Sequence, residues 1–141
     1  MSPTPLDTVR RSAAEVLQDH LQLREAAELE EDLRRNYAPD VVLLGARGVL
    51  RGHEGVRASA AFLYEAGAGH EYRYHLTVSD DRMALLEWSA TGHDRRIVDG
   101  VDSYLIEDGM IKAQTIHYRV ESRELSVSRH AVTPLETATS Q

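Results

Sequence analysis

The chain has 141 residues, a formal net charge of −7 and no cysteine. This length suits one domain with a single core, and the scattered acidic charge disfavours nucleic acid as a partner. The lack of cysteine excludes disulfides, thiolate catalysis and cysteine-ligated zinc. No secretory signal or membrane-length apolar run is present, so we expect a cytoplasmic protein with no membrane partner.

Two helices are predicted at the start of the chain. The first begins at Thr4, which can cap it, followed by Pro5 in the first turn. Its apolar stripe has intervals of three and four residues and consists of Leu6, Val9, Ala13, Val16, Leu17 and Leu21. A second helical stretch places Ala26, Leu29, Leu33 and Tyr37 on one side, and Pro39 is expected to end it.

A short hairpin and a third helix follow. Residues 41–44 and the pair Val49-Leu50 flank a glycine-containing turn, which predicts two short strands. Residues 53–66 return to helical spacing, and Gly67 and Gly69 are expected to stop that helix.

A meander of strands is predicted next, because the apolar period changes to two from Glu71 onward. The expected strands cover residues 71–78, 83–92, 97–107 and 110–120, and Asp108-Gly109 predicts a type I′ turn between the last two. Leu125 and Val127 alternate with serines, as a short extra strand would, before a loose tail. Helices followed by strands predict an α+β fold.

Asp102 is the first candidate for a functional residue. It lies in the middle of a strand that otherwise reads as core, and an ionised carboxylate costs several kcal/mol to bury without a partner. The position therefore predicts a pocket, with a structural, hydrogen-bonded aspartate as the alternative. Asp99 alternates to the opposite face, where a solvated or interface charge is expected.

Three stretches of the chain resemble a known superfamily. They read NYAPDVVLL, GVLRGHEGVRASAAF and GVDSYLIEDGMIKAQTIHY, and they resemble the nuclear transport factor 2-like superfamily, most closely its SnoaL-like and ketosteroid-isomerase-like branches. The resemblance runs from about Val9 to Val120. It implies a cystatin-like cone, with three helices on a strongly curved, mostly antiparallel sheet around a central pocket. A SnoaL-like single domain over residues 1–122 is then expected, with residues 123–141 as an extension, partly disordered or packed on a partner subunit.

The resemblance also implies roles for particular positions. Asp102 falls where the ketosteroid isomerases keep the acid that donates a hydrogen bond to the dienolate oxygen. Their general base is expected after the first strand, where this chain has Gly45. The tyrosine of their first helix has no counterpart, since the stripe there holds Val16, Leu17 and Leu21.

The partner of Asp102 on the last strand is either His117 or Tyr118. Plain pairing across Asp108-Gly109 sets Asp102 opposite Thr115 and places His117 on its face, whereas alignment to the isomerases places Gln114, Ile116 and Tyr118 there. A β-bulge in the last strand would explain why these two registers differ. We favour His117 as the acid-base partner, because an imidazole and a buried carboxylate can exchange a proton near neutral pH.

The other candidates are aromatic. Tyr37, Trp88, Tyr104 and Tyr118 are predicted to line a ligand pocket, with core packing as the alternative for each. The remaining histidines (His20, His53, His70, His75 and His93) show no metal-ligand spacing, and no nucleophile elbow or phosphate loop is present. We therefore expect neither a metal nor another cofactor.

The function predicted from these residues is binding of a small hydrophobic molecule in the cone. Asp102, with His117, would transfer a proton in a cofactor-independent isomerase, cyclase or dehydratase. The alternative is a non-catalytic ligand-binding or dimeric interaction module, which Gly45 at the base position favours. A homodimer through the sheet is expected in either case.

Overall fold

The computed structural model describes residues 11–67 and 71–122 of the chain. The elements in order are α2 (Ala13–Glu25), α3 (Leu29–Asn36), β1 (Tyr37–Gly45), β2 (Gly48–Arg51), α4 (Gly52–Glu65), β3 (Glu71–Ser79), β4 (Met83–Thr91), β5 (Arg95–Glu107) and β6 (Met110–Ser122). This is the predicted succession of two helices, a short hairpin, a helix and a meander. The expected helix start at Thr4 and the expected strand around Leu125 lie outside the described residues.

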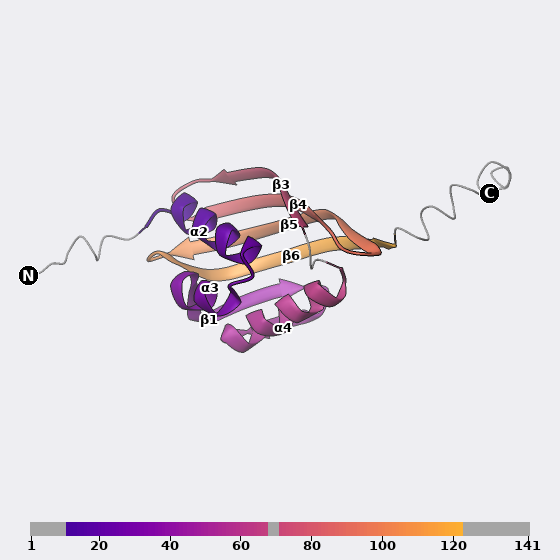
Figure 1. The fold of residues 1–141 in the computed structure, drawn as a ribbon. Coiled ribbons are helices and arrows are strands. Elements are labelled where there is room, and N and C mark those ends of the chain that lie inside the picture. The colour runs from indigo at the N-terminus through magenta and orange to yellow at the C-terminus, as the bar shows by residue number, and fades with distance from the viewer. Residues whose placement is uncertain (1–10, 68–70, 123–141) are drawn as a thin grey trace, which may run out of the picture.

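The strands form one mixed sheet in the order β2-β1-β6-β5-β4-β3. Neighbouring strands are antiparallel except for β1 and β6, which run parallel. Figure 1 shows the three described helices on one face of the sheet, with α2 across the central strands and α4 in front of β1. One face of the sheet is thus covered by helices, and the α+β fold class is confirmed.

Helix α2 begins with a cap that we did not predict. The Ser12 hydroxyl accepts from the backbone N–H of Glu15, and the Glu15 carboxylate accepts from the backbone N–H of Ser12. This reciprocal pair is a capping box, which satisfies donors that a helix start leaves unpaired. The Ser-x-x-Glu spacing is visible in the sequence and was the better start signal for α2.

The second helix is shorter than predicted. It begins at Leu29, after Ala27 has taken a left-handed φ of 60°, and it ends at Asn36. Tyr37 is therefore the first residue of β1, and Pro39 lies within that strand and does not end the helix. The pairing of β1 with β6 is interrupted between Tyr37 and Val42, which accommodates a proline without a backbone N–H.

The hairpin between β5 and β6 fixes the register of the candidate site. Asp108 and Gly109 both have positive φ, at 56° and 72°, as a type I′ turn requires. The ladder then shifts, because Ile106 pairs with Ile111 but Leu105 pairs with Ala113. The extra residue, Lys112, forms a bulge that moves the pairs from Leu105 to Val101 by one position, and a second shift between Val98 and Val101 restores the first register.

The core lies between the helices and the inner face of the sheet. Its fully buried side chains come from all parts of the described chain and include Val16, Leu33, Leu43, Val56, Leu86, Trp88, Ile97, Tyr104 and Ile111. Burial of this apolar surface is the main favourable term for folding.

Candidate functional site

Asp102 lies on the inner face of β5 and is 7% exposed. Its Oδ1 accepts a hydrogen bond from Trp88 Nε1 at 3.0 Å, and its Oδ2 accepts from Gln114 Nε2 at 3.1 Å and from the Tyr104 hydroxyl at 3.4 Å. A carboxylate offers about four lone-pair positions, so these bonds leave one on Oδ1. The buried carboxylate is solvated by side chains and keeps room for one further donor.

Gly100 allows Trp88 to reach Asp102. The two residues are paired across β4 and β5, and the indole lies against the Gly100 backbone. A Cβ at position 100 would lie 2.4 Å from the Trp88 Cε2 atom, far inside contact distance. The missing side chain therefore sets the position from which the indole N–H donates.

Gln114 is held in turn by Tyr37. The Tyr37 hydroxyl donates to Gln114 Oε1, which fixes the amide so that its Nε2 points to Asp102. Both residues are buried, Tyr37 at the start of β1 and Gln114 on β6. Sequence reasoning placed Gln114 on this face only through the isomerase alignment and gave it no role.

His20 and Asp32 extend the polar network behind Tyr104. His20 Nδ1 lies 2.8 Å from Asp32 Oδ2, and both side chains are buried. Asp32 Oδ1 accepts from Asn36 Nδ2 at 2.8 Å. An ionised carboxylate only accepts, so we assign the proton of the first bond to Nδ1, and His20 Nε2 then lies 3.4 Å from the Tyr104 hydroxyl.

We did not predict the pair of His20 and Asp32 from the sequence. His20 lies on the apolar stripe of α2, three residues after Leu17, and Asp32 lies on that of α3, beside Leu33. A polar residue at a core position on each of two consecutive helices was the available signal. It points to a buried pair, because such groups are rarely kept without a partner.

Burial dominates the electrostatics of the site. It raises the pKa of Asp102 to about 6, against the hydrogen bonds from Trp88 and Gln114, which lower it. Burial also raises the pKa of Tyr104 and of Tyr37 well above the ordinary tyrosine value, so both hydroxyls stay protonated donors. Asp102 can therefore take up or release a proton near neutral pH.

The network lines a small cavity that adjoins a larger groove. The inner cavity has a volume of about 50 Å³, and among the residues lining it are Asp102, Tyr104, Trp88, Gln114, Tyr37 and His20. The groove has a volume of about 490 Å³ and shares Leu43, Ser59 and Ile116 with the cavity. The groove and the cavity therefore lie on either side of these three residues.

His117 does not lie on the Asp102 face, and the preference for it as the partner on that face is wrong. Asp102 pairs with Ile116, whereas His117 pairs with Val101 and is exposed. The physical reason is the bulge at Lys112, which plain hairpin pairing omits. Tyr118 takes the inner position, with its ring centroid 5.9 Å from that of Trp88. His117 and Tyr118 both border the outer groove.

Asp99 is exposed on the other side of β5, as expected. Its carboxylate Oδ2 lies 2.8 Å from Arg119 Nη2, and its side chain is 64% exposed. In the described residues no cluster of three histidine or acidic side chains could hold a metal ion. None of the helices described is long and apolar enough to cross a bilayer.

Solved structures share this fold at low sequence identity. A steroid delta-isomerase from Pseudomonas aeruginosa is 24% identical, with a TM-score of 0.62, over 76% of this chain and 79% of its own. A candidate SnoaL-like polyketide cyclase from Mesorhizobium loti is 18% identical, with a TM-score of 0.55, over 77% of this chain and 100% of its own. TerC, crystallised with polyporic acid, is 16% identical, with a TM-score of 0.61, over 86% of this chain and 97% of its own.

No curated protein sequence matches this chain closely enough to indicate an activity. The model of the SnoaL-like domain matches residues 17–114, which include most of α2, the β1–β2 hairpin, α4 and Asp102 itself. The match covers more than half of the chain and agrees with the cone-shaped α+β fold. The chain therefore belongs to the family of SnoaL-like domains, within the nuclear transport factor 2-like superfamily.

Proposed function

We propose that this protein binds a small hydrophobic molecule in the cone and moves a proton at a carbon next to a carbonyl group. Isomerases, cyclases and dehydratases of this kind share that step and need no cofactor. The observation that carries the proposal is the buried Asp102 carboxylate, which has a pKa raised to about 6 and adjoins a cavity.

Asp102 acts as the base in this scheme. Above pH 6 it is ionised and removes the proton from carbon, and it then returns the proton to another carbon or to a leaving oxygen. The single Tyr104 proton, which is donated to Asp102 in the free protein, turns to the developing oxyanion when a ligand is bound, because burial keeps this hydroxyl protonated. His20, bonded to Asp32, lies 3.4 Å from the Tyr104 hydroxyl on its other side.

Two of the structures with this fold support this choice of chemistry. One is a steroid delta-isomerase and another is a candidate polyketide cyclase, and both have the fold of this chain. Their identities are below 25%, so the chemistry is inferred from Asp102 and its surroundings.

A deuterium-exchange assay tests the proposal. The probe is 3-cyclohexen-1-one in D₂O, followed by NMR for exchange next to the carbonyl and for migration of the double bond. Asp102→Asn should slow catalysed exchange by about 100-fold or more, because the base is lost. Asp99→Asn, an exposed change on the same strand, should leave it unaltered. Wild-type exchange no faster than that of Asp102→Asn would contradict the proposal.

A non-catalytic binding module is the second candidate. Its support is that the three side-chain donors satisfy most of Asp102 and that Gly45 supplies no second carboxylate. The inner cavity of about 50 Å³ is also small, close to the space of one or two water molecules. Saturable binding of the ketone without exchange would favour this candidate.

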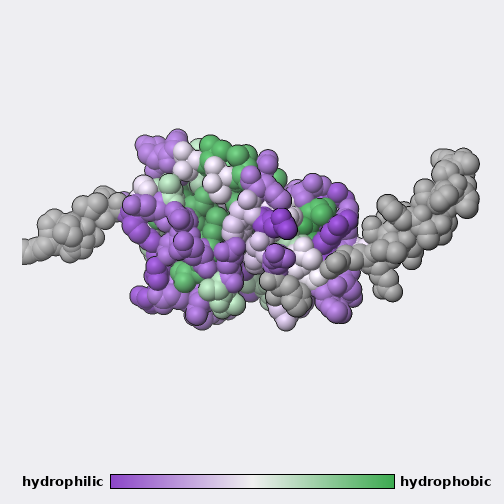
Figure 2. All heavy atoms as spheres, turned by 45° about the horizontal axis from the view of Figure 1, so that its top comes forward, coloured by the Kyte–Doolittle hydropathy of each residue, from purple (hydrophilic) through white to green (hydrophobic). Residues whose placement is uncertain are grey.

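We also propose that two copies pair through the outer face of the sheet. Leu76, Val78, Met83 and Val101 are exposed there on β3, β4 and β5. Figure 2, seen from the helix side with the β3 edge brought forward, shows a hydrophobic area at that edge, bordered by hydrophilic residues. Burial of such an area favours association. Light scattering at micromolar concentration should give a dimer mass that Val78→Lys halves, and a monomeric wild type would contradict the pairing.

A further inference from the structure

Arg24 is a cation at an inward position of α2. It follows His20 by four residues, and the preceding members of this stripe, Val16, Leu17 and His20, are all buried. The side chain of Arg24 lines the same inner cavity as Asp102 and is partly buried. The helix thus directs a guanidinium toward the proposed ligand space.

This guanidinium has no counterion in the described part of the chain. Residues 11–67 and 71–122 offer it neither a hydrogen bond nor an ion pair, whereas Arg57, Arg82 and Arg119 each pair with a carboxylate. The nearby acid that acts on Arg24 is Asp32, and both of its oxygens are already bonded, to His20 and Asn36. An unpaired charge in a cavity wall is costly unless something else supplies the opposite charge.

Asp102 does not supply that charge either. Its described partners are Trp88, Tyr104 and Gln114. The guanidinium of Arg24 and the carboxylate of Asp102 therefore line one cavity without forming an ion pair with each other. Apolar and aromatic side chains complete the walls, among them Leu21, Leu63, Tyr72 and Tyr74. The cavity, with the groove that adjoins it, thus offers a ligand a cation, a base and hydrophobic walls.

We propose that the ligand is a small hydrophobic carboxylate, whose acidic group binds Arg24 and whose reactive carbon lies beside Asp102. The guanidinium fork matches the two oxygens of a carboxylate, and the like charge of Asp102 turns that group away from itself. This inference rests on the proposed binding of a hydrophobic molecule in the cone and adds its chemical class.

Binding of two matched probes tests the proposal. Cyclohexanecarboxylate and the neutral cyclohexanecarboxamide have the same ring, and Trp88, the one tryptophan of the chain, reports binding from the cavity wall. Wild-type protein should bind the carboxylate about tenfold more tightly than the amide, as measured by Trp88 fluorescence and calorimetry. Arg24→Gln should reduce the ratio to about one, and Arg24→Lys should keep part of it.

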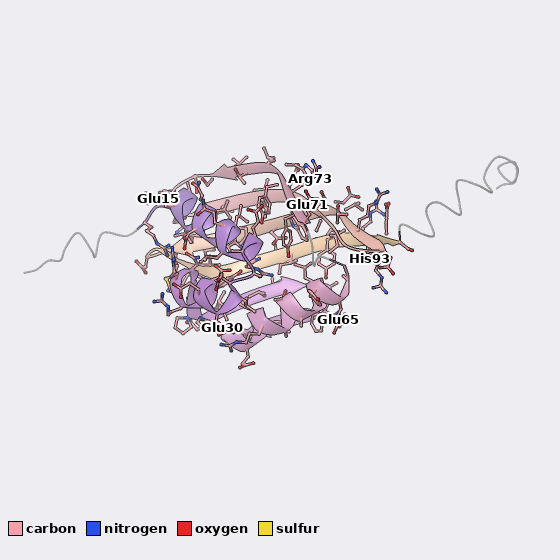
Figure 3. The ribbon with its side chains drawn as sticks, viewed as in Figure 1. Glu15, Glu30, Glu65, Glu71, Arg73 and His93 are labelled. Atoms are coloured by element: carbon pink, nitrogen blue, oxygen red, sulfur yellow. The ribbon has the colours of Figure 1, made fainter. Side chains whose placement is uncertain are left out.

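Arg73→Gln is the matched control, because Arg73 is an exposed arginine on the edge strand β3, away from the cavity lining (Figure 3). It should keep the wild-type preference. Equal binding of the two probes by wild type, or a preference that survives Arg24→Gln, would overturn the proposal. A fall in the melting temperature of Arg24→Gln by more than about 5 °C would also overturn it, since it would give Arg24 a structural role.

The proposed function fails in a different way. Asp102→Asn should lose ketone exchange yet keep the preference for the carboxylate, because Arg24 is intact and a like charge is gone. Carboxylate preference without any exchange by wild type would remove the catalytic proposal and leave this inference standing. Ketone exchange by wild type without a preference for the carboxylate would overturn this inference and leave the catalytic proposal standing. If wild type bound neither the carboxylate nor the amide, the ligand class proposed here would also be overturned.

Discussion

Asp99 and Asp102 lie three residues apart on β5 and face opposite sides of the sheet. Asp99 is 64% exposed and pairs with Arg119, whereas Asp102 is 7% exposed and accepts only from neutral donors. Water screens the outer carboxylate, but the inner one depends on Trp88, Gln114 and Tyr104 for its solvation. The comparison teaches that the pleat of one strand can separate a surface charge from a titrating group.

The largest expected difference between buried and exposed carboxylates concerns the loss of a hydrogen-bonded partner. His20–Asp32 and Arg119–Asp99 both have a separation of 2.8 Å, but only the first is buried. Asp32→Ala should lower the free energy of unfolding by about 3–5 kcal/mol, because His20 and Asn36 lose a buried partner. Asp99→Ala should lower it by less than about 1 kcal/mol. Urea unfolding measures both, and equal losses would remove the contrast.

The second difference appears in the pH dependence of stability. Asp102 has a pKa of about 6 in the folded chain, against 3.8 for an ordinary aspartate. The folded state therefore binds the proton more tightly, and stability from this group is full below pH 3.8 and is lost as pH rises through about 6. The loss amounts to roughly 3 kcal/mol, at about 1.4 kcal/mol for each pKa unit.

Other carboxylates also titrate in this range, so the informative quantity is the difference in free energy of unfolding between wild type and a variant. From pH 4 to pH 7, the stability of Asp102→Asn relative to wild type should rise by most of that amount, because asparagine does not titrate. Asp99→Asn should show no such trend in chemical unfolding. If the difference in stability between Asp102→Asn and wild type did not change with pH, burial would leave the pKa of Asp102 unaltered.

The smallest expected effect comes from the contact that positions the indole. Gly100→Ala places a methyl group against Trp88 and should cost about 1–3 kcal/mol, because the ring must move. Val101→Ala, on the outer face beside it, should cost less than half as much. Near-ultraviolet circular dichroism would report the displaced indole. An unchanged Trp88 signal in Gly100→Ala would show that the close approach does not hold the ring.

Much of this architecture could be predicted from the sequence, because it depends on local patterns. The change of period at Glu71 and the Asp108-Gly109 turn gave the meander and its last hairpin correctly. Plain hairpin pairing could not give the register, since the bulge at Lys112 has no local signal and moves His117 to the other face; only the resemblance to the isomerases placed Gln114, Ile116 and Tyr118 beside Asp102. The His20–Asp32 pair depends on how two helices pack, which periodicity does not specify.

The pH dependence of ketone exchange tests the central claim most directly, because it shows whether the inner carboxylate transfers the proton. For wild type, kcat/KM for deuterium exchange into 3-cyclohexen-1-one should rise with pH and level off, with a midpoint near the Asp102 pKa of about 6. Asp102→Asn should show only the uncatalysed rate at every pH. A wild-type profile that matches the Asp102→Asn profile, or a midpoint near 3.8, would contradict the account.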